Sequence, residues 1–356
     1  MASDLDNPRG LDFGPWGALY VAEAGRGGEG PCIEGEDGTV CAGVSGAITK
    51  IWHGKQRRVL EDLPSIAAQG SPETPQSPAV LAGSDALGPN DISFSGFRAY
   101  FPVGLGGNPD LRDQLGEELG PQFGQLYKAS PFGRVRAVAD LAAFEAAKNP
   151  DRDQPEGAEP NSNPASVLAR PGRQYVVDAG GNDLLKVGPT GRIRALAVFP
   201  ERLVPAPPGI ADLPPELSMQ AVPTAVVRGP DHALYVSQLT GFPFPVGGAS
   251  IYRVDKRGGE PEVYPSDSTT FTNVTDLAFG PDGSLYVVEI ATNGLLSGDP
   301  TGALKRIAPD GSVSDDLANG ELVAPYGVTV SRKGRIYVST HSTEPDAGEV
   351  VRVDTD

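Results

Sequence analysis

The feature that most constrains this chain is one phrase that occurs six times along it. Each copy has a short apolar run, a turn ending in Gly, and then an aliphatic-Tyr-Val triplet or a close relative. The tyrosines of the six copies are Tyr20, Tyr100, Tyr175, Tyr235, Tyr286 and Tyr337. A β-rich unit whose repeat settles at about 50 residues is typical of a propeller, in which each repeat forms one blade.

The composition agrees with many short strands joined by tight turns. The 356 residues include 46 Gly and 35 Pro, which favour turns and disfavour long helices. Six repeats of four strands would use the whole chain, so we predict one domain over residues 1–356. The predicted fold is all-β: a six-bladed β-propeller with four-stranded antiparallel blades. The expected blades are residues 7–62, 88–142, 163–200, 222–266, 273–318 and 324–356. Only residues 141–148, rich in Ala, have a helical pattern.

The connections between strands differ in length, which predicts where function lies. With the strands of each blade lettered a to d from the axis outward, the a–b and c–d turns are short throughout. The b–c and d–a loops are long, mainly in the first three blades. In a propeller these two kinds of loop emerge on the same face, here called the loop face; the opposite face is the turn face. Binding residues are more frequent on loops held by a rigid frame, so we expect the site on the loop face.

The last blade poses a closure problem. Its outer strand should come from the N-terminus, as in other propellers, which would remove an open edge. Only residues 1–5 precede the first inner strand. We therefore expect the last blade to lack a full outer strand.

The charge balance limits the partners. With 29 basic and 46 acidic residues, the net charge is −17, which disfavours nucleic acid and anionic lipid and favours cations, Ca²⁺ included. No apolar run is long enough to insert into a membrane. The two cysteines, Cys32 and Cys41, share one Gly-rich loop that contains neither a His nor a third Cys, which predicts a local disulfide. A disulfide predicts export to a secreted or periplasmic location, with a signal peptide that this sequence does not contain.

Polar side chains gather where strands should meet the loop face. The residue three positions after the repeat Tyr is polar in five of six copies, and strand a begins there with further polar residues. The candidates for ligand binding are Glu23, Asn90, Asp178, Gln238 and Glu289. Asp91 and Asp276 belong to opposite blades and are the candidates for a Ca²⁺ site at the mouth of the axial channel, because Ca²⁺ prefers oxygen ligands. The alternative is that these side chains cap backbone N–H groups of the loops.

Three further residues on the loop face are candidates for binding or catalysis. Phe242 and Phe244, stiffened by neighbouring prolines, could stack against a ligand or cover blade four. His341 follows strand b of blade six and is the one histidine placed for acid–base chemistry. The stretch at residues 149–153 has a D-x-D spacing but lacks the Gly of a calcium loop. No nucleophile elbow, His cluster or phosphate-binding loop occurs.

Several loop phrases resemble the ScyD/ScyE family over nearly the whole chain. They are Asn7 to Leu11, Val103 to Gly107, Asp178 to Leu185, Met219 to Thr224, Gln238 to Pro245 and Glu289 to Gly298. The resemblance implies a secreted propeller related to the NHL and SMP-30-like groups. The related SMP-30-like and paraoxonase enzymes use an axial Ca²⁺, and the resemblance implies Ca²⁺ as the candidate cofactor here.

Two functions from different classes remain open. The first is an exported propeller that binds a small molecule or metal ion on the loop face, with a protein partner as a further option. The second is a metal-assisted hydrolase, lactonase or lyase acting at the channel mouth, favoured by the carboxylates. The lack of a catalytic motif favours the first, and the sequence does not decide whether the protein is an enzyme.

Overall fold

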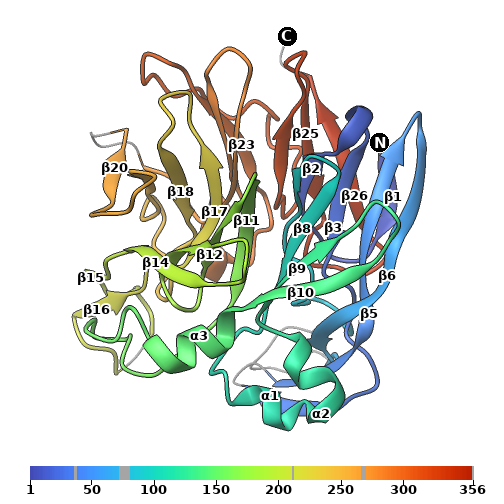
Figure 1. Cartoon of the computed structure of the whole chain (residues 1–356). Coiled ribbons are helices and arrows are strands. Elements are labelled where there is room, and N and C mark those ends of the chain that lie inside the picture. The colour runs from blue at the N-terminus through green and yellow to red at the C-terminus, as the bar shows by residue number, and fades with distance from the viewer. Residues whose placement is uncertain (36–37, 72–80, 211, 266–269, 355–356) are drawn as a thin grey trace.

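The computed structural model describes the chain except residues 36–37, 72–80, 211, 266–269 and 355–356. The described residues form antiparallel sheets that surround one axis as the six blades of a propeller (Figure 1). The predicted fold is confirmed. The expected ends of blades four and six, at residue 266 and at residues 355–356, lie outside the described residues.

Each blade runs from an inner strand a to an outer strand, and neighbours in this order are hydrogen-bonded. Blade 1 comprises β2 (Pro8–Phe13), β3 (Leu19–Glu23), β5 (Gly38–Trp52) and β6 (Lys55–Ala68). Blade 2 comprises β7 (Ser93–Ser95), β8 (Arg98–Val103), β9 (Gln125–Ala129) and β10 (Val135–Asp140). Blade 3 comprises β11 (Pro164–Arg170), β12 (Arg173–Asp178), β13 (Asp183–Val187) and β14 (Ile193–Val198).

The remaining blades follow the same order. Blade 4 comprises β17 (Pro223–Arg228), β18 (Leu234–Gln238), β19 (Ile251–Val254) and β20 (Glu262–Tyr264). Blade 5 comprises β21 (Val274–Phe279), β22 (Leu285–Glu289) and β23 (Ala303–Ile307), and its outer segment joins through a bridge between Ile307 and Val313. Blade 6 comprises β24 (Val328–Val330), β25 (Ile336–Thr340), β26 (Gly348–Val353) and β1 (Ala2–Leu5).

The hydrophobic core is divided into layers between neighbouring blades. The largest cluster joins blades 1 and 2 around Ile48, Phe101 and Phe123, and others join each successive pair of blades. The middle strands are apolar on both faces because each is covered by a blade on either side. The repeat phrase therefore encodes this packing, and the packing holds the six inner strands around the axis.

The expectation that the last blade lacks its outer strand is wrong. Four residues suffice: β1 pairs with β26 through Ala2 opposite Val350 and Leu5 opposite Gly348. Leu5 is 1% exposed and packs with Leu11 and Val350 in the layer between blades 6 and 1. A short strand closes the ring because its two end residues, Ala2 and Leu5, are buried in this layer, while Ser3 and Asp4 stay exposed.

The α-helices of the long loops lie at the lower end of the molecule in Figure 1. The helix α3 (Leu141–Lys148) is confirmed, and the Asp140 side chain caps it by accepting from the Ala143 N–H. Two four-residue helices, α1 (Leu111–Gln114) and α2 (Gly116–Leu119), were not expected. Three 3-10 turns (Pro15–Gly17, Gly120–Gln122, Leu295–Ser297) complete the helical part. None of the described helices has the length and apolar character that a membrane span requires.

Two hairpins also project from the loop face. β4 (Cys32–Gly35) pairs with the first half of β5, where Cys32 lies opposite Cys41, and the predicted disulfide joins them. β15 (Arg202–Pro205) pairs with β16 (Glu216–Met219) between blades 3 and 4. The disulfide fastens a loop hairpin rather than the blades themselves.

Candidate axial site

The inner strands leave backbone N–H groups facing the axis, because strand a has a sheet neighbour on one side only. Buried N–H groups need acceptors, so side chains on the axis must supply them. Aspartate does so in three blades: Asp12 on β2, Asp91 just before β7, and Asp276 on β21. The pairing register of β2 with β3 shifts between Pro8 and Leu11, just before Asp12. The register of β21 with β22 shifts between Val274 and Asp276. Such bulges re-aim side chains.

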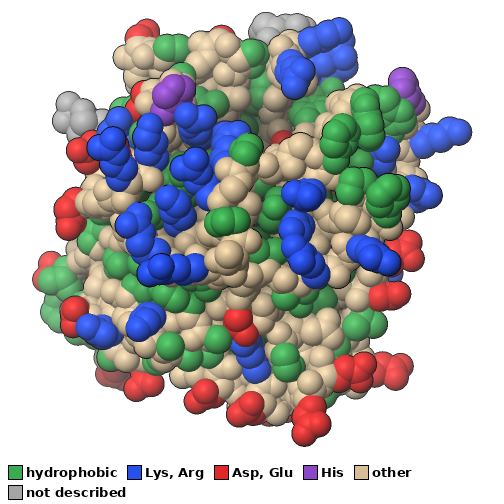
Figure 2. Space-filling model, viewed as in Figure 1, with side chains coloured by type: hydrophobic (Ala, Val, Ile, Leu, Met, Phe, Trp, Pro, Cys, Tyr) green, Lys and Arg blue, Asp and Glu red, His purple; other side chains and the backbone are tan. Residues whose placement is uncertain are grey.

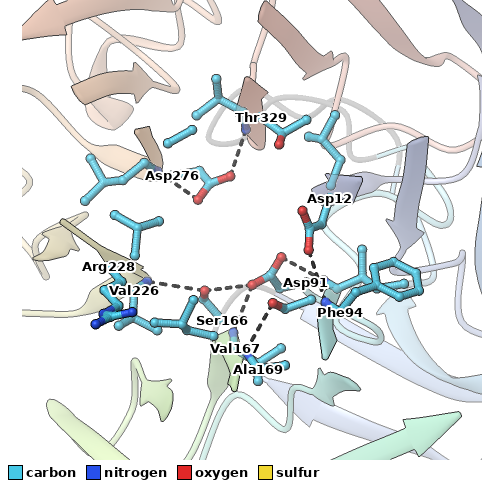
Figure 3. Close-up of a pocket in the computed structure, with 18 of the residues that line it drawn as sticks. Asp12, Asp91, Phe94, Ser166, Val167, Ala169, Val226, Arg228, Asp276 and Thr329 are labelled. Atoms are coloured by element: carbon cyan, nitrogen blue, oxygen red, sulfur yellow. Dashed lines mark hydrogen bonds between the residues drawn. The ribbon is translucent and has the colours of Figure 1, made fainter. Parts of the chain in front are cut away.

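Each aspartate spans two neighbouring blades. Asp12 accepts from the N–H of Phe94 at 3.1 Å, and Asp276 accepts from the N–H of Val328 at 2.7 Å. Asp91 accepts from the N–H of Val167 at 2.9 Å and from the Ser166 hydroxyl at 2.7 Å. The three carboxylates point toward a common open centre in Figure 3. They therefore link blades 1 to 2, 2 to 3 and 5 to 6 while lining the channel.

Burial of these carboxylates disfavours their charged form. Burial raises the pKa of Asp12 to about 7 and that of Asp91 to about 6, although their backbone hydrogen bonds act in the opposite direction. Burial and the neighbouring Asp91 raise the pKa of Asp276 well above its ordinary value. In the described part of the chain no Lys or Arg forms an ion pair with any of the three. Burial therefore favours the protonated form of the three carboxyl groups, and among the causes of their pKa shifts only Arg170, near Asp12, supplies an opposing positive charge.

These side chains line an axial cavity of about 280 Å³. Its walls are the halves of the inner strands that run toward the a–b turns, so the cavity lies on the turn-face side of the channel. Arg170 and Arg228, at the ends of β11 and β17, also line it. Burial, with the neighbouring Arg228, lowers the pKa of Arg170, and the buried Nε of Arg170 has no hydrogen-bond partner in the structure. The cavity thus has acidic groups from blades 1, 2 and 5 around its wall and basic groups from blades 3 and 4 toward its rim.

The loop-face end of the axis is filled instead. The Arg9 guanidinium lies 4.6 Å from the centre of the Tyr326 ring and donates to the carbonyl of Ala86 at 2.8 Å. Arg9 is 7% exposed. The sequence analysis expected Asp91 and Asp276 at a mouth on the loop face. The structure places both on a cavity at the opposite end, because Arg9 and Tyr326 occupy the loop-face end.

Glycine at position 10 permits this arrangement. A Cβ on Gly10 would lie 2.1 Å from Oδ1 of Asp91, closer than any van der Waals contact allows. The same repeat position holds Asp91 in blade 2 and Asp276 in blade 5. A side chain in blade 1 would displace the carboxylate of blade 2.

The predicted ligand-binding residues on strand b are spread around the ring and fasten their own blades. Glu23 pairs with Arg58 at 2.6 Å, and Glu289 pairs with Lys305 at 2.7 Å. Asp178 accepts from the Ser162 hydroxyl at 2.7 Å and from two glycine N–H groups of its own loop. These contacts match the capping alternative of the sequence analysis, and the structure does not bring the three together.

The other candidates also lie apart from the cavity. Asn90 donates to the carbonyl of Pro164 at 3.0 Å, and Gln238 accepts from the N–H of Ser250 at 3.0 Å. Phe242 and Phe244 contact each other edge to face at 6.2 Å, and Phe242 remains partly exposed. His341 lies in blade 6, where its backbone N–H donates to the carbonyl of Val323. Their roles in binding or catalysis stay predictions.

A second group of carboxylates is buried at the loop-face end of blade 3. Burial, with Asp178 and Asp151 nearby, raises the pKa of Glu145 to about 8. Asp183 is fully buried, neither of its carboxylate oxygens has a hydrogen-bond partner in the structure, and its pKa is raised well above the ordinary value by burial and by Asp178. Asp151 belongs to the D-x-D stretch noted in the sequence. The mutual repulsion makes this group a source of pH sensitivity.

The described residues of the axis form no ready-made cluster of ligands for the Ca²⁺ ion that the family resemblance implies, and this cofactor stays a prediction. Both oxygens of Asp91 and of Asp276 already accept backbone N–H groups. Among the described residues, no three His, Cys, Asp or Glu side chains are arranged to hold one metal ion. We therefore assign no step to a metal at this site.

The sequence analysis missed Asp12, Arg170 and Arg228. One signal was present: Asp12 is an acidic residue inside an otherwise apolar inner strand, where blades 3 and 4 have Leu168 and Val227. The two arginines end strand a immediately before a turn, where a basic residue is usually a solvated surface residue. Their contribution to the cavity depends on the convergence of the strands.

Comparisons with known proteins show the fold alone. No protein-family model matches the chain, and no curated protein matches it in sequence. Among solved structures it is similar to a streptogramin B lyase, at 13% identity and a TM-score of 0.50 over 99% of this chain and 95% of that one. It is also similar to a protein of unknown function from Bacteroides thetaiotaomicron, at 11% identity and a TM-score of 0.57 over 99% and 70%. A chain of a nidogen/laminin complex has 12% identity and a TM-score of 0.50 over 89% of each chain.

Proposed function

We propose that the protein binds a small polar molecule with a cationic group in the axial cavity, entered from the turn face. The observation that carries this proposal is the convergence of Asp12, Asp91 and Asp276 on one cavity, where none of the three forms an ion pair with a described residue. An ammonium or similar donor is the complement of such a wall. A ligand cation would offset the cost of burying these charges.

Two basic residues at the rim of the cavity indicate that the ligand also carries an anionic group. Arg170 and Arg228 lie on the wall toward the turn face, and the unpartnered Nε of Arg170 is a free donor. A zwitterion would place its cationic group among the aspartates and its anionic group on the arginines. A volume of about 280 Å³ suits a molecule no larger than an amino acid or a small sugar derivative.

The test is a thermal-shift screen followed by calorimetry. The probes are lysine, arginine, betaine, choline and putrescine, because a bound ligand raises the melting temperature by mass action. We expect at least one zwitterionic probe to bind the wild type and to lose affinity in an Asp91→Asn, Asp276→Asn variant. Asp282→Asn, in the exposed a–b turn of blade 5, is the matched control. Equal affinity in the wild type and the double variant would contradict the proposal.

A second candidate function is proton transfer on a molecule held in the cavity. It is favoured by two carboxyl groups, Asp12 and Asp91, whose pKa values of about 7 and about 6 suit acid–base catalysis near neutral pH. A lyase or hydrolase of this kind would use one as the acid and the other as the base. A bell-shaped rate profile abolished by Asp12→Asn would support it. A pH-independent rate, or one that survives the substitution, would contradict it.

The family and the location are further proposals. Membership of the ScyD/ScyE family, proposed from the loop phrases, is supported by the propeller fold, because the resemblance implies that fold. The disulfide supports export to an oxidising compartment. Detection of the chain in a culture supernatant or periplasmic fraction of its source would test the location.

A further inference from the structure

A cleft between blades 1 and 2, opening on the turn face, is lined by aromatic and basic side chains, and the rings of Trp16 and Phe97 contact each other across it at 5.2 Å. Its volume is about 400 Å³, and its floor includes Tyr20 and Phe94, whose rings lie 4.8 Å apart. Three aromatic side chains stand at its rim: Trp16 is 78% exposed, Phe97 is 54% exposed and Phe132 is 93% exposed. Aromatic side chains this exposed are uncommon on a surface without a binding role.

The cleft also holds two basic side chains that form no ion pair with a described residue. Lys50 and Arg57 lie opposite each other on β5 and β6 and line one wall. The Nζ of Lys50 lies 5.8 Å from the centre of the Tyr20 ring. In the described part of the chain, no carboxylate forms an ion pair with either residue. The wall is therefore positive although the whole chain carries −17.

The other blades provide an internal comparison. Every repeat tyrosine has a basic residue opposite it on strand c, and these residues are Lys50, Lys128, Lys186, Arg253, Arg306 and Arg352. In blades 4 and 5 that residue pairs at 2.8 Å with an aspartate of the a–b turn, Asp231 or Asp282. In blade 1, Trp16 stands at the turn position that holds aspartate in blades 4 and 5. Blade 1 therefore has an aromatic side chain where blades 4 and 5 have the aspartate of this ion pair.

A second hollow extends the positive charge along blade 2. It shares Ala129 and Ser130 with the cleft and is lined by four basic residues: Arg98, Lys128, Arg134 and Arg136. Burial, with Arg136 and Arg98 nearby, lowers the pKa of Lys128. Figure 2 shows Lys and Arg side chains gathered over the upper part of this face, with hydrophobic side chains exposed between them and acidic ones along the lower margin. At physiological salt, screening over about 8 Å lets this local charge dominate over the distant acidic loops.

We propose that the cleft between blades 1 and 2 binds an amphipathic organic anion. A flat apolar body would lie against Tyr20, Phe94 and Phe97, and an acidic group would face Lys50 and Arg57. Charge complementarity favours an anion, and a concave site of this size suits a small molecule rather than a flat protein surface. This site is distinct from the axial cavity, whose carboxylates select the opposite charge.

The probe is anilinonaphthalene sulfonate, an aromatic anion whose fluorescence rises in an apolar site, compared with N-phenyl-1-naphthylamine, which lacks the sulfonate. We expect the wild type to bind the sulfonate about tenfold more tightly than the neutral compound, with an affinity that falls as salt rises. A Lys50→Gln, Arg57→Gln variant should lose this preference. Phe97→Ser should weaken both compounds. Lys186→Gln, opposite Tyr175 in blade 3 and outside the cleft, should change neither.

Three results would overturn the proposal. Equal affinity for the two compounds in the wild type would show that charge has no role. Unchanged sulfonate binding in the Lys50, Arg57 variant would place the probe elsewhere. Displacement of the sulfonate by a decapeptide of alternating Glu and Phe, at concentrations below those of the sulfonate itself, would show a surface built for an acidic protein segment.

Discussion

Replacement of Asp12 by asparagine should destabilise the protein at pH 4 and stabilise it at pH 8. In the folded protein the pKa of Asp12 is raised from 3.8 to about 7 by burial. The stability that this proton contributes is fully present below pH 3.8 and is lost as the pH rises through 7. Since each tenfold change is worth about 1.4 kcal/mol, the wild type loses on the order of 4 kcal/mol by pH 8. Asparagine does not titrate, so the variant avoids this loss.

The substitution also has a cost that does not depend on pH. Asp12 accepts from the N–H of Phe13 at 2.7 Å and from that of Phe94 at 3.1 Å, and an amide supplies only one acceptor for these two donors. Leaving one buried donor unpaired costs about 1 kcal/mol or more. We therefore expect the variant to be less stable than the wild type by about 1 kcal/mol at pH 4 and more stable by about 2–3 kcal/mol at pH 8. The two profiles should cross between about pH 4 and pH 5.

Urea unfolding at closely spaced pH values measures this difference directly. The exposed Asp4→Asn variant is the control and should follow the wild-type profile. Other buried carboxyl groups titrate in both proteins, so the difference between them isolates Asp12. An Asp12→Asn variant that is less stable by the same amount at every pH would refute the reasoning, because it would mean that Asp12 is ionised in the fold without cost.

Three further expectations concern other parts of the molecule. Leu5→Ala should lower the free energy of unfolding, measured in urea, by about 2–5 kcal/mol because Leu5 is 1% exposed and anchors the closing strand. A decrease below about 1 kcal/mol would mean that β1 does not close the ring. Asp183→Asn should stabilise the protein at pH 8 by about 1–3 kcal/mol because it removes a buried charge without hydrogen-bond partners. A loss of stability at pH 8 would show that the folded protein compensates this charge. Chelator-treated protein titrated with Ca²⁺ in a calorimeter should give the same heat for the wild type and for the Asp91→Asn, Asp276→Asn variant. The reason is that the four carboxylate oxygens of Asp91 and Asp276 already accept N–H groups. A heat that disappears in the variant would place calcium on the axis.

The fold could be predicted because its information is local. The Tyr-centred phrase repeats within each blade, and the alternation of apolar residues on strands b and c reports burial between neighbouring blades. Closure was misjudged for a quantitative reason. Counting residues 1–5 suggested too short a strand, whereas the structure shows that two ladder positions and the buried Leu5 are enough.

The candidate site was only half predictable. Asp91 and Asp276 could be identified because they are acidic residues at the start of inner strands, and the structure shows both lining the axial cavity. Their direction along the axis could not, because it depends on register shifts in the inner strands and on Arg9 and Tyr326, which fill the loop-face end. The long loops lie at one end of the channel and this cavity at the other, so loop length gave no signal for the cavity.

The sequence by itself determined the six blades, their strands, the disulfide and the identity of the acidic residues. Tertiary structure decided which of these acidic residues share a cavity and which cap their own loops. Asp12 and Asp276 are 264 residues apart in sequence but line the same cavity, because ring closure brings the inner strands of blades 1 and 5 to one axis. Glu23 and Glu289, at equivalent repeat positions, stay within their blades on Arg58 and Lys305. Repeats encode contacts between neighbours, whereas a site on the axis requires all the blades at once.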